Sequence, residues 1–244
     1  MSGAVLILGA RSDIARACAH RYARDGFGVM LAARGAADLE PDAQDLRLRH
    51  RVAVSCHDFD VLDTAGFAGF LDSLPALPDV VICAVGAMGD QAQSQRDPAA
   101  AAQVLRANFE GPALILGLLA ERFEAAGRGV IVGISSVAGD RGRASNYVYG
   151  AAKAGFTAFL SGLRNRLARG PVRVITVKPG FVATRMTEGL PLNPRLTAQP
   201  AEVAEAIRAA DLRGRDVIYV RRIWRLVMAI IRALPEFLFK KTRL

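Results

Sequence analysis

The stretch AVLILGARSDIARACAH, residues 4–20, decides the fold class. Five apolar residues (4–8) form a run typical of a buried strand, Gly9 begins a tight turn, and a helix-like stretch follows. In such a unit the helix N-terminus presents free N–H groups and the positive end of its dipole to a phosphate. Asp13 could instead cap the helix with its side chain. The candidates for dinucleotide contacts in this turn are Gly9, Arg11, Ser12, Asp13 and Ile14.

Apolar runs and helix-like stretches alternate along the rest of the chain. Further strand-like runs lie at 27–33, 51–56, 79–85, 129–134, 172–178 and 216–220. Helix-like stretches lie at 12–25, 36–48, 64–73, 97–126, 147–168 and 200–211. The strand-like runs are apolar on both faces, which is typical of a parallel sheet covered by helices on each side. We therefore expect an α/β fold, a single-domain Rossmann-type doubly wound parallel sheet of about seven strands with helices on both faces.

Composition excludes several classes of protein. With 52% hydrophobic residues the chain is not expected to be disordered. Its 244 residues suffice for one such domain but not comfortably for two. Three cysteines and three histidines, widely spaced, predict neither a disulfide framework nor a metal site. Because the chain starts on a strand without a signal peptide, we expect a cytoplasmic protein.

The basic residues gather at the C-terminus. The net charge is +9, and residues 221–244 hold seven basic residues against one acidic residue. We therefore divide the chain into a domain at 1–220 and a basic amphipathic C-terminal helix at 221–244. Its apolar run is too short to span a bilayer, but a helix of this kind can lie on an anionic membrane surface, here the inner face. Packing on its own fold or on a second subunit is the alternative; no nucleic-acid module is found.

The end of the second strand indicates which dinucleotide would bind. Residues 27–33 lead into Arg34, where an NAD-specific site usually carries an acid for the ribose 2′-hydroxyl. Arg34 and Arg11 together offer two guanidiniums, whose fork geometry suits a 2′-phosphate. NADP(H) is therefore favoured over NAD(H). The alternative is that Arg34 is only a solvated residue at a strand end.

Four polar residues suggest acid–base chemistry. Tyr149 and Lys153 lie one helical turn apart, so an ammonium would adjoin a phenol and lower its pKa. Ser136 follows the strand-like run 129–134 and brings a hydroxyl to the end of that strand. Asn108, a mediocre helix former in the middle of a helix-like stretch, marks either a helix irregularity or a polar link to the lysine through water.

With these residues in this order, the chain resembles the short-chain dehydrogenase/reductase family over essentially its whole length. The resemblance implies that Asn108, Ser136, Tyr149 and Lys153 are catalytic. It implies further cofactor contacts from Asp60, Val61, Ala84, Val85, Gly86, Pro179, Gly180, Val182 and Thr184, with Asp58 as a competing position for Asp60. The family's later glycines are replaced by Asp13 and Ala15, and its Asn-Asn pair by Cys83-Ala84, so we expect altered cofactor affinity rather than lost chemistry.

A longer stretch indicates a branch of the family. SSVAGDRGRASNYVYGAAKAG (135–155) resembles the branch that contains decaprenylphosphoryl-2-keto-ribose reductases, as do residues 86–90 and 224–240. That resemblance implies an NADPH-dependent ketoreductase acting on a lipid-linked keto sugar, with a flavin-dependent partner oxidase. The family resemblance implies a mobile substrate lid at 185–199 and a homodimer or homotetramer. The alternatives are a soluble carbonyl or 3-oxoacyl reductase and a non-catalytic NADP(H)-sensing protein.

Overall fold

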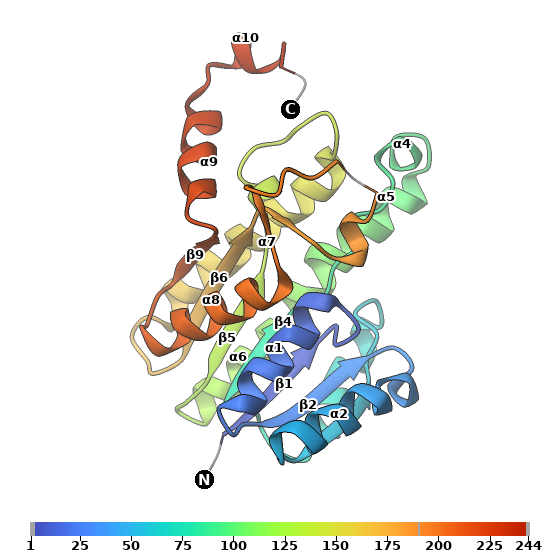
Figure 1. Cartoon of the computed structure of the whole chain (residues 1–244), viewed down its shortest axis with the longest axis vertical. Helices are drawn as coiled ribbons and strands as arrows, with labels where there is room; N and C mark the ends of the chain where they lie inside the picture. The colour runs from blue at the N-terminus through green and yellow to red at the C-terminus, as the bar shows by residue number, and fades with distance from the viewer. Residues whose placement is uncertain (1–2, 190, 243–244) are drawn as a thin grey trace.

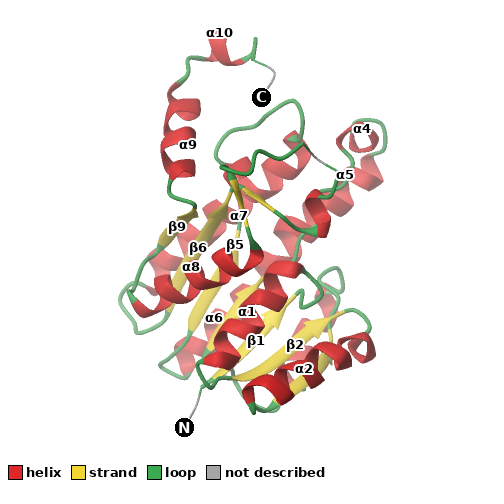
Figure 2. Cartoon of the chain, in the orientation of Figure 1, coloured by secondary structure: helices red, strands yellow, loops and turns green. Residues whose placement is uncertain are grey.

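A seven-stranded parallel sheet forms the centre of the molecule (Figure 1, Figure 2). The computed structural model describes residues 3–189 and 191–242. The sheet order is β3-β2-β1-β4-β5-β6-β9, and every neighbouring pair is parallel. The strands are β1 (Ala4–Leu8), β2 (Gly28–Ala33), β3 (Val54–Asp58), β4 (Val80–Cys83), β5 (Val130–Ile134), β6 (Arg173–Pro179) and β9 (Val217–Val220). The expected doubly wound sheet is confirmed, and its order reverses between β1 and β4, where such sheets bind ligands.

Helices cover both faces of the sheet because successive strand residues point to opposite sides. Val5 and Ile7 of β1 belong to one buried cluster, and Leu6 and Leu8 belong to the other. On the first face pack α1 (Asp13–Arg24), α2 (Glu40–His50) and α8 (Pro200–Leu212). On the second face pack α3 (Phe67–Asp72), α6 (Gly111–Ala125) and α7 (Tyr147–Leu167). Short 3₁₀ turns η1 (Ala36–Leu39) and η2 (Thr64–Gly66) precede α2 and α3.

The helix predicted at 97–126 is interrupted. It consists of α5 (Pro98–Leu105), a π-helical turn η3 (Arg106–Glu110) and α6. Pro112 has no N–H to bond the carbonyl of Asn108, and the N–H of Gly111 bonds the carbonyl of Arg106, five residues back. The π turn thus marks Asn108 as the helix irregularity that its residue type indicated. Three further elements were not predicted from the sequence: the short helix α4 (Gln91–Ser94) and the small parallel pair β7 (Phe181–Val182) and β8 (Thr197–Ala198).

The C-terminal segment leaves the end of β9 as α9 (Ile223–Ala233), followed by α10 (Glu236–Phe239) (Figure 1). Trp224, Met228 and Ile231 are buried together with Val137, so one face of α9 packs on its own chain. The opposite face, with Leu226 and Ile230, is exposed.

Within residues 3–189 and 191–242 no helix has the length and apolarity needed to cross a bilayer. Leu190 of the expected lid and Arg243 of the basic tail lie outside the described residues.

Candidate active site

Two adjoining cavities open at the carboxyl ends of the strands. The outer cavity, about 490 Å³, lies between the ends of β1, β2 and β3 and helix α5. The inner cavity, about 350 Å³, lies between α1, β5, α7 and the loop after β6. Ser12, Ala84, Val85 and Gly86 line both. The two therefore form one continuous trough across the switch point of the sheet.

Of the predicted site residues, all but one line this trough. The outer cavity contains Gly9, Arg11, Ser12, Arg34, Asp60, Val61, Ala84, Val85 and Gly86. The inner cavity contains Ser12, Asp13, Ile14, Ala84, Val85, Gly86, Ser136, Tyr149, Lys153, Pro179, Gly180, Val182 and Thr184. Asn108 lines neither cavity.

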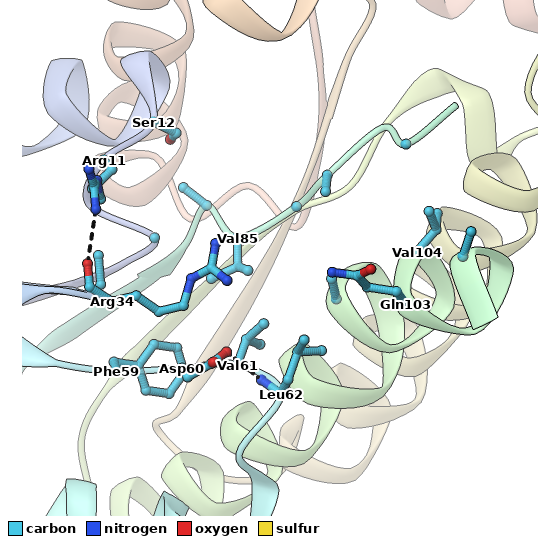
Figure 3. A pocket seen from close by; sticks show the side chains of 18 of the residues that line it. Arg11, Ser12, Arg34, Phe59, Asp60, Val61, Leu62, Val85, Gln103 and Val104 are labelled. Carbon is cyan, nitrogen blue, oxygen red and sulfur yellow. Dashed lines mark hydrogen bonds between the residues drawn. The ribbon is translucent and has the colours of Figure 1, made fainter. Parts of the chain in front are cut away.

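The two predicted guanidiniums, those of Arg11 and Arg34, line the outer cavity but differ in their partners (Figure 3). Arg34 is exposed, and its side chain extends along the cavity toward Val85. Arg11 donates to the backbone carbonyl of Arg34 at 3.2 Å and pairs with Asp38 at 3.1 Å. Asp38 was not considered from the sequence, and it engages one of the two guanidiniums.

The competing positions Asp58 and Asp60 have separate places in the structure. Asp58 accepts a hydrogen bond from the N–H of Gly35 at 2.9 Å and so fixes the loop after β2. Asp60 lines the outer cavity beside Val61 (Figure 3). Of these two acids, Asp60 is therefore the one that faces the trough.

The glycine turn fits a bound dinucleotide. Gly9 has φ +81°, and a Cβ there would lie 2.9 Å from the N atom of Val85, so a side chain would strain the turn and close its approach to β4. Ser12 caps α1 by accepting from the N–H of Ala15 at 3.1 Å. The start of α1 thus faces the trough where a pyrophosphate would contact its remaining N–H groups.

Asp13 does not cap the helix but pairs with the segment after β7. It accepts from the backbone N–H of Arg185 at 2.9 Å and from its Nε at 3.2 Å. Arg185 also donates to the backbone carbonyl of Arg11. The acid that replaces the family's second glycine is therefore neutralised by an arginine from the expected lid.

Ser136, Tyr149 and Lys153 meet in the inner cavity. Ser136 is the second residue after β5. Ser135, which lies between them, donates to the carbonyl of Lys153 at 3.0 Å and bonds the hydroxyl of Thr157 at 2.6 Å. These two bonds hold α7 against the end of β5. Lys153 is buried, its Nζ donates to the carbonyl of Ile134 at 3.1 Å, and it lies 5.8 Å from the centre of the Tyr149 ring.

The electrostatics of this group correct one expectation. Burial raises the pKa of Tyr149 to about 12, and a hydrogen bond with Ser136 partly opposes this rise. Burial also lowers the pKa of Lys153 to about 8. The net shift of the Tyr149 pKa therefore runs opposite to the expected lowering, because desolvation of the buried phenol is its largest cause. The phenol keeps its proton at neutral pH.

Asn108 holds the wall behind the lysine. It is fully buried in the π turn, donates to the carbonyls of Ala87 and Val104 at 2.7 and 2.8 Å, and accepts from the N–H of Ala87 at 3.2 Å. A Cβ on Gly86 would lie 2.8 Å from Asn108 Oδ1 and 3.3 Å from Lys153 Nζ. The absence of a side chain at Gly86 thus allows Asn108 and Lys153 to lie close to the same stretch of backbone.

The C-terminal helix adds a wall that the sequence analysis did not foresee. Trp224 lines the inner cavity and packs so closely on Gly180 that a Cβ there would lie 2.0 Å from its ring. Its edge meets Phe181, with ring centres 5.7 Å apart, and its Nε1 donates to the carbonyl of Leu196 at 3.0 Å. The other lining residues that were not predicted include Met88, Arg143, Asn146, Phe181 and Met186. Arg143 and Asn146 lie in the sequence between Ser136 and Tyr149. This position between two predicted catalytic residues could have identified them as residues of the cavity.

Known proteins are similar to this chain in sequence and in fold. A family model described as short chain dehydrogenase matches residues 3–194. An uncharacterized oxidoreductase of Mycobacterium tuberculosis is 38% identical over 240 residues, which cover 97% of this chain and 96% of the relative.

Solved structures share this fold. A short-chain dehydrogenase from Sphingobium yanoikuyae in complex with NADPH superposes with a TM-score of 0.81 at 24% identity, covering 96% of this chain and 97% of that one. A variant of actinorhodin polyketide ketoreductase with NADPH superposes with a TM-score of 0.78 at 25% identity, covering 90% and 95%. The chain therefore belongs to the short-chain dehydrogenase/reductase family and is a nicotinamide-dependent oxidoreductase.

Proposed function

We propose that the protein is an NADPH-dependent ketoreductase in which Tyr149 gives a proton to the carbonyl oxygen of the substrate. The observation that carries this proposal is the meeting of Tyr149, Ser136 and Lys153 in one cavity, with a phenol that is protonated at neutral pH. A positioned general acid contributes about 10²–10⁴-fold to the rate. The hydroxyl of Ser136 donates to the developing oxyanion, an effect of a few kcal/mol. Asn108 positions the wall behind Lys153.

The residues of the trough suit a nicotinamide cofactor, which supplies a hydride when bound. Gly9 and Ser12 shape the turn at the start of α1, where the backbone N–H groups of Asp13 and Ile14 would contact the pyrophosphate. Asp60 and Val61 would contact the adenine. Lys153 would bind the nicotinamide ribose. The loop residues Pro179, Gly180, Val182 and Thr184, and the β4 end Ala84, Val85 and Gly86, would position the nicotinamide ring.

NADP(H) is the proposed form of the cofactor. Arg34 extends along the outer cavity without an acidic partner among the described residues, and Arg11 lies beside it. The two solved neighbours named above carry NADPH, which supports the same choice.

For the substrate we propose a lipid-linked keto sugar, with a flavin-dependent oxidase as the partner that supplies the ketone. Phe181, Met186 and Trp224 give the inner cavity an apolar wall, and Trp224 joins this wall to α9. A soluble carbonyl or 3-oxoacyl reductase is the second candidate. NADPH oxidation with a lipid-phosphate-linked 2-keto sugar and with a water-soluble ketone distinguishes them. Preference for the soluble ketone contradicts the first proposal.

The outer face of α9 is the proposed contact with a membrane surface. Leu226 and Ile230 are 63% and 56% exposed there. The basic residues Arg222, at the N-cap of α9, and Arg225, in its first turn, lie near them in the sequence. Sedimentation with anionic phospholipid vesicles should be salt-dependent and should fall in the double variant Leu226→Ser, Ile230→Ser. If the variant leaves vesicle binding unchanged but converts a homodimer or homotetramer into a monomer, the face is a subunit contact instead.

A further inference from the structure

Arg143 is a charged residue of the inner cavity that the proposed proton transfer does not use. It lies on the segment between Ser136 and Tyr149. Within residues 3–189 and 191–242 its guanidinium has no hydrogen-bond or ion-pair partner, and its Nε atom is buried. Burial lowers the pKa of this guanidinium, because no acid compensates its lost hydration. An unpaired, partly desolvated charge costs free energy. The five N–H donors of this guanidinium are therefore open to a ligand in the inner cavity.

The acids near Arg143 are engaged elsewhere. Asp140 pairs with Lys178 at 2.5 Å, and Asp13, the acid lining the inner cavity, pairs with Arg185. Arg141, two residues before Arg143, shows what a structural arginine does on this loop. It donates to the carbonyls of Ile231 and Leu234 at 2.7 and 2.6 Å, caps the end of α9 and pairs with Glu236. Arg143 makes none of these contacts.

Asn146 gives a second, independent sign of a missing partner. It is the N-cap residue of α7, a position that asparagine favours because its side chain bonds a free N–H of the first turn. Here the side chain makes no such bond, and its buried Oδ1 is without a partner among the described residues. Asn146 lines the inner cavity beside Arg143 and Tyr149. The positive end of α7 therefore adds to the charge of Arg143 at this place.

Building on the proposed ketoreductase function, we propose that the substrate carries an anionic group, a phosphate ester or a carboxylate, which binds to Arg143 beside Asn146 while its carbonyl faces Tyr149 and Ser136. The guanidinium fork matches the paired oxygens of either anion. The buried Oδ1 of Asn146 can only accept a hydrogen bond, so its partner is a hydroxyl of the same ligand and not the anionic group. Arg143 thus determines substrate selectivity and takes no part in proton transfer.

Binding to the protein saturated with NADP⁺ tests the subsite without turnover. Calorimetry compares cyclohexyl phosphate, cyclohexanecarboxylate and the uncharged cyclohexanol, and the tighter of the two anions identifies the source of the charge. We expect at least one anion to bind about 10- to 100-fold more tightly than the alcohol, the range of charge-assisted hydrogen bonds. Arg143→Gln should remove this preference, Arg143→Lys should keep part of it, and the exposed control Arg213→Gln should keep all of it.

A kinetic arm and a second variant complete the test. The ratio of kcat/KM for 4-oxocyclohexanecarboxylate to that for its methyl ester should fall by about 10- to 100-fold in Arg143→Gln. Asn146→Ala should leave this anion preference close to that of the wild type, because the buried Oδ1 accepts hydrogen bonds and cannot bond the oxygens of an anion. Equal binding of anions and alcohol by the wild type, or an anion preference that survives Arg143→Gln, overturns the subsite. Anion preference without reduction of any ketone would instead overturn the proposed function and leave the subsite standing.

Discussion

Replacing Trp224 by alanine tests whether the C-terminal helix is part of the substrate cavity. The ring is 5% exposed, packs on Gly180 and Phe181, and donates one hydrogen bond to Leu196. Truncation of a buried tryptophan costs about 3–5 kcal/mol, and a hydrogen bond contributes about 1 kcal/mol of that. For a chain of this size each kcal/mol lowers Tm by about 2–4 °C.

Part of this loss should appear as local opening. The described α9 is held to the domain by the cluster of Val137, Trp224, Met228 and Ile231, and its C-terminal end is held by the hydrogen bonds of Arg141. Loss of the Trp224 ring can therefore loosen this helix while the sheet stays folded. We expect Trp224→Ala to lower Tm by less than the full amount, to speed hydrogen exchange in 185–199 and 223–239, and to raise KM for the ketone.

Trp224→Phe is the milder comparison, because it keeps an aromatic ring but removes the indole edge (Cδ1, Nε1 and Cε2) that packs on Gly180, together with the hydrogen bond of Nε1. It should cost less than Trp224→Ala and speed hydrogen exchange in the two segments less than Trp224→Ala does. If Trp224→Ala leaves KM and the exchange of both segments unchanged, α9 is not a wall of the cavity.

Three further predictions concern charge. Arg34→Ala should weaken NADPH binding about 10-fold in a fluorescence titration and leave NADH binding unchanged; an equal effect on both would remove Arg34 from the 2′-phosphate site. The pKa of Lys153 is about 8 in the folded protein against an ordinary 10.5. Between these pH values this lysine is protonated in the unfolded chain but not in the folded one. Its contribution therefore makes the free energy of unfolding rise from pH 8 toward pH 10. Urea unfolding at several pH values should show this rise in the wild type relative to Lys153→Met; a constant difference contradicts it. Asp140→Asn leaves Lys178 buried without its carboxylate and should cost about 3–5 kcal/mol in urea unfolding, whereas Asp38→Asn at an exposed pair should cost about 0–1 kcal/mol; equal costs would refute the distinction.

The strands were predictable because each is a local apolar run between turn residues. β1 agrees at both ends with the predicted 4–8, and the other strands differ by a few residues. The break in the predicted helix 97–126 was not predictable from its apolar period, since it depends on the missing N–H of Pro112 and on the bonds of Asn108 to the Ala87 backbone.

The site residues also fall into those that the local sequence predicted and those that only the tertiary structure shows. Ser136, Tyr149 and Lys153 lie close in sequence, so one strand end and one helix bring them together. Trp224 reaches Gly180 only through the path of the chain around β9, and no local pattern records that contact. The pairing of Arg11 with Asp38 and the direction of the Tyr149 pKa also depend on tertiary burial and on partners chosen in space.

Turnover and cofactor binding by Tyr149→Phe test the proton-transfer proposal most directly. The substitution removes one hydroxyl and keeps the ring, so NADPH affinity should stay within about 2-fold of the wild type while kcat for ketone reduction falls by about 10²–10⁴-fold. A variant that binds NADPH normally and reduces the ketone at a rate near that of the wild type would show that the proton comes from another group.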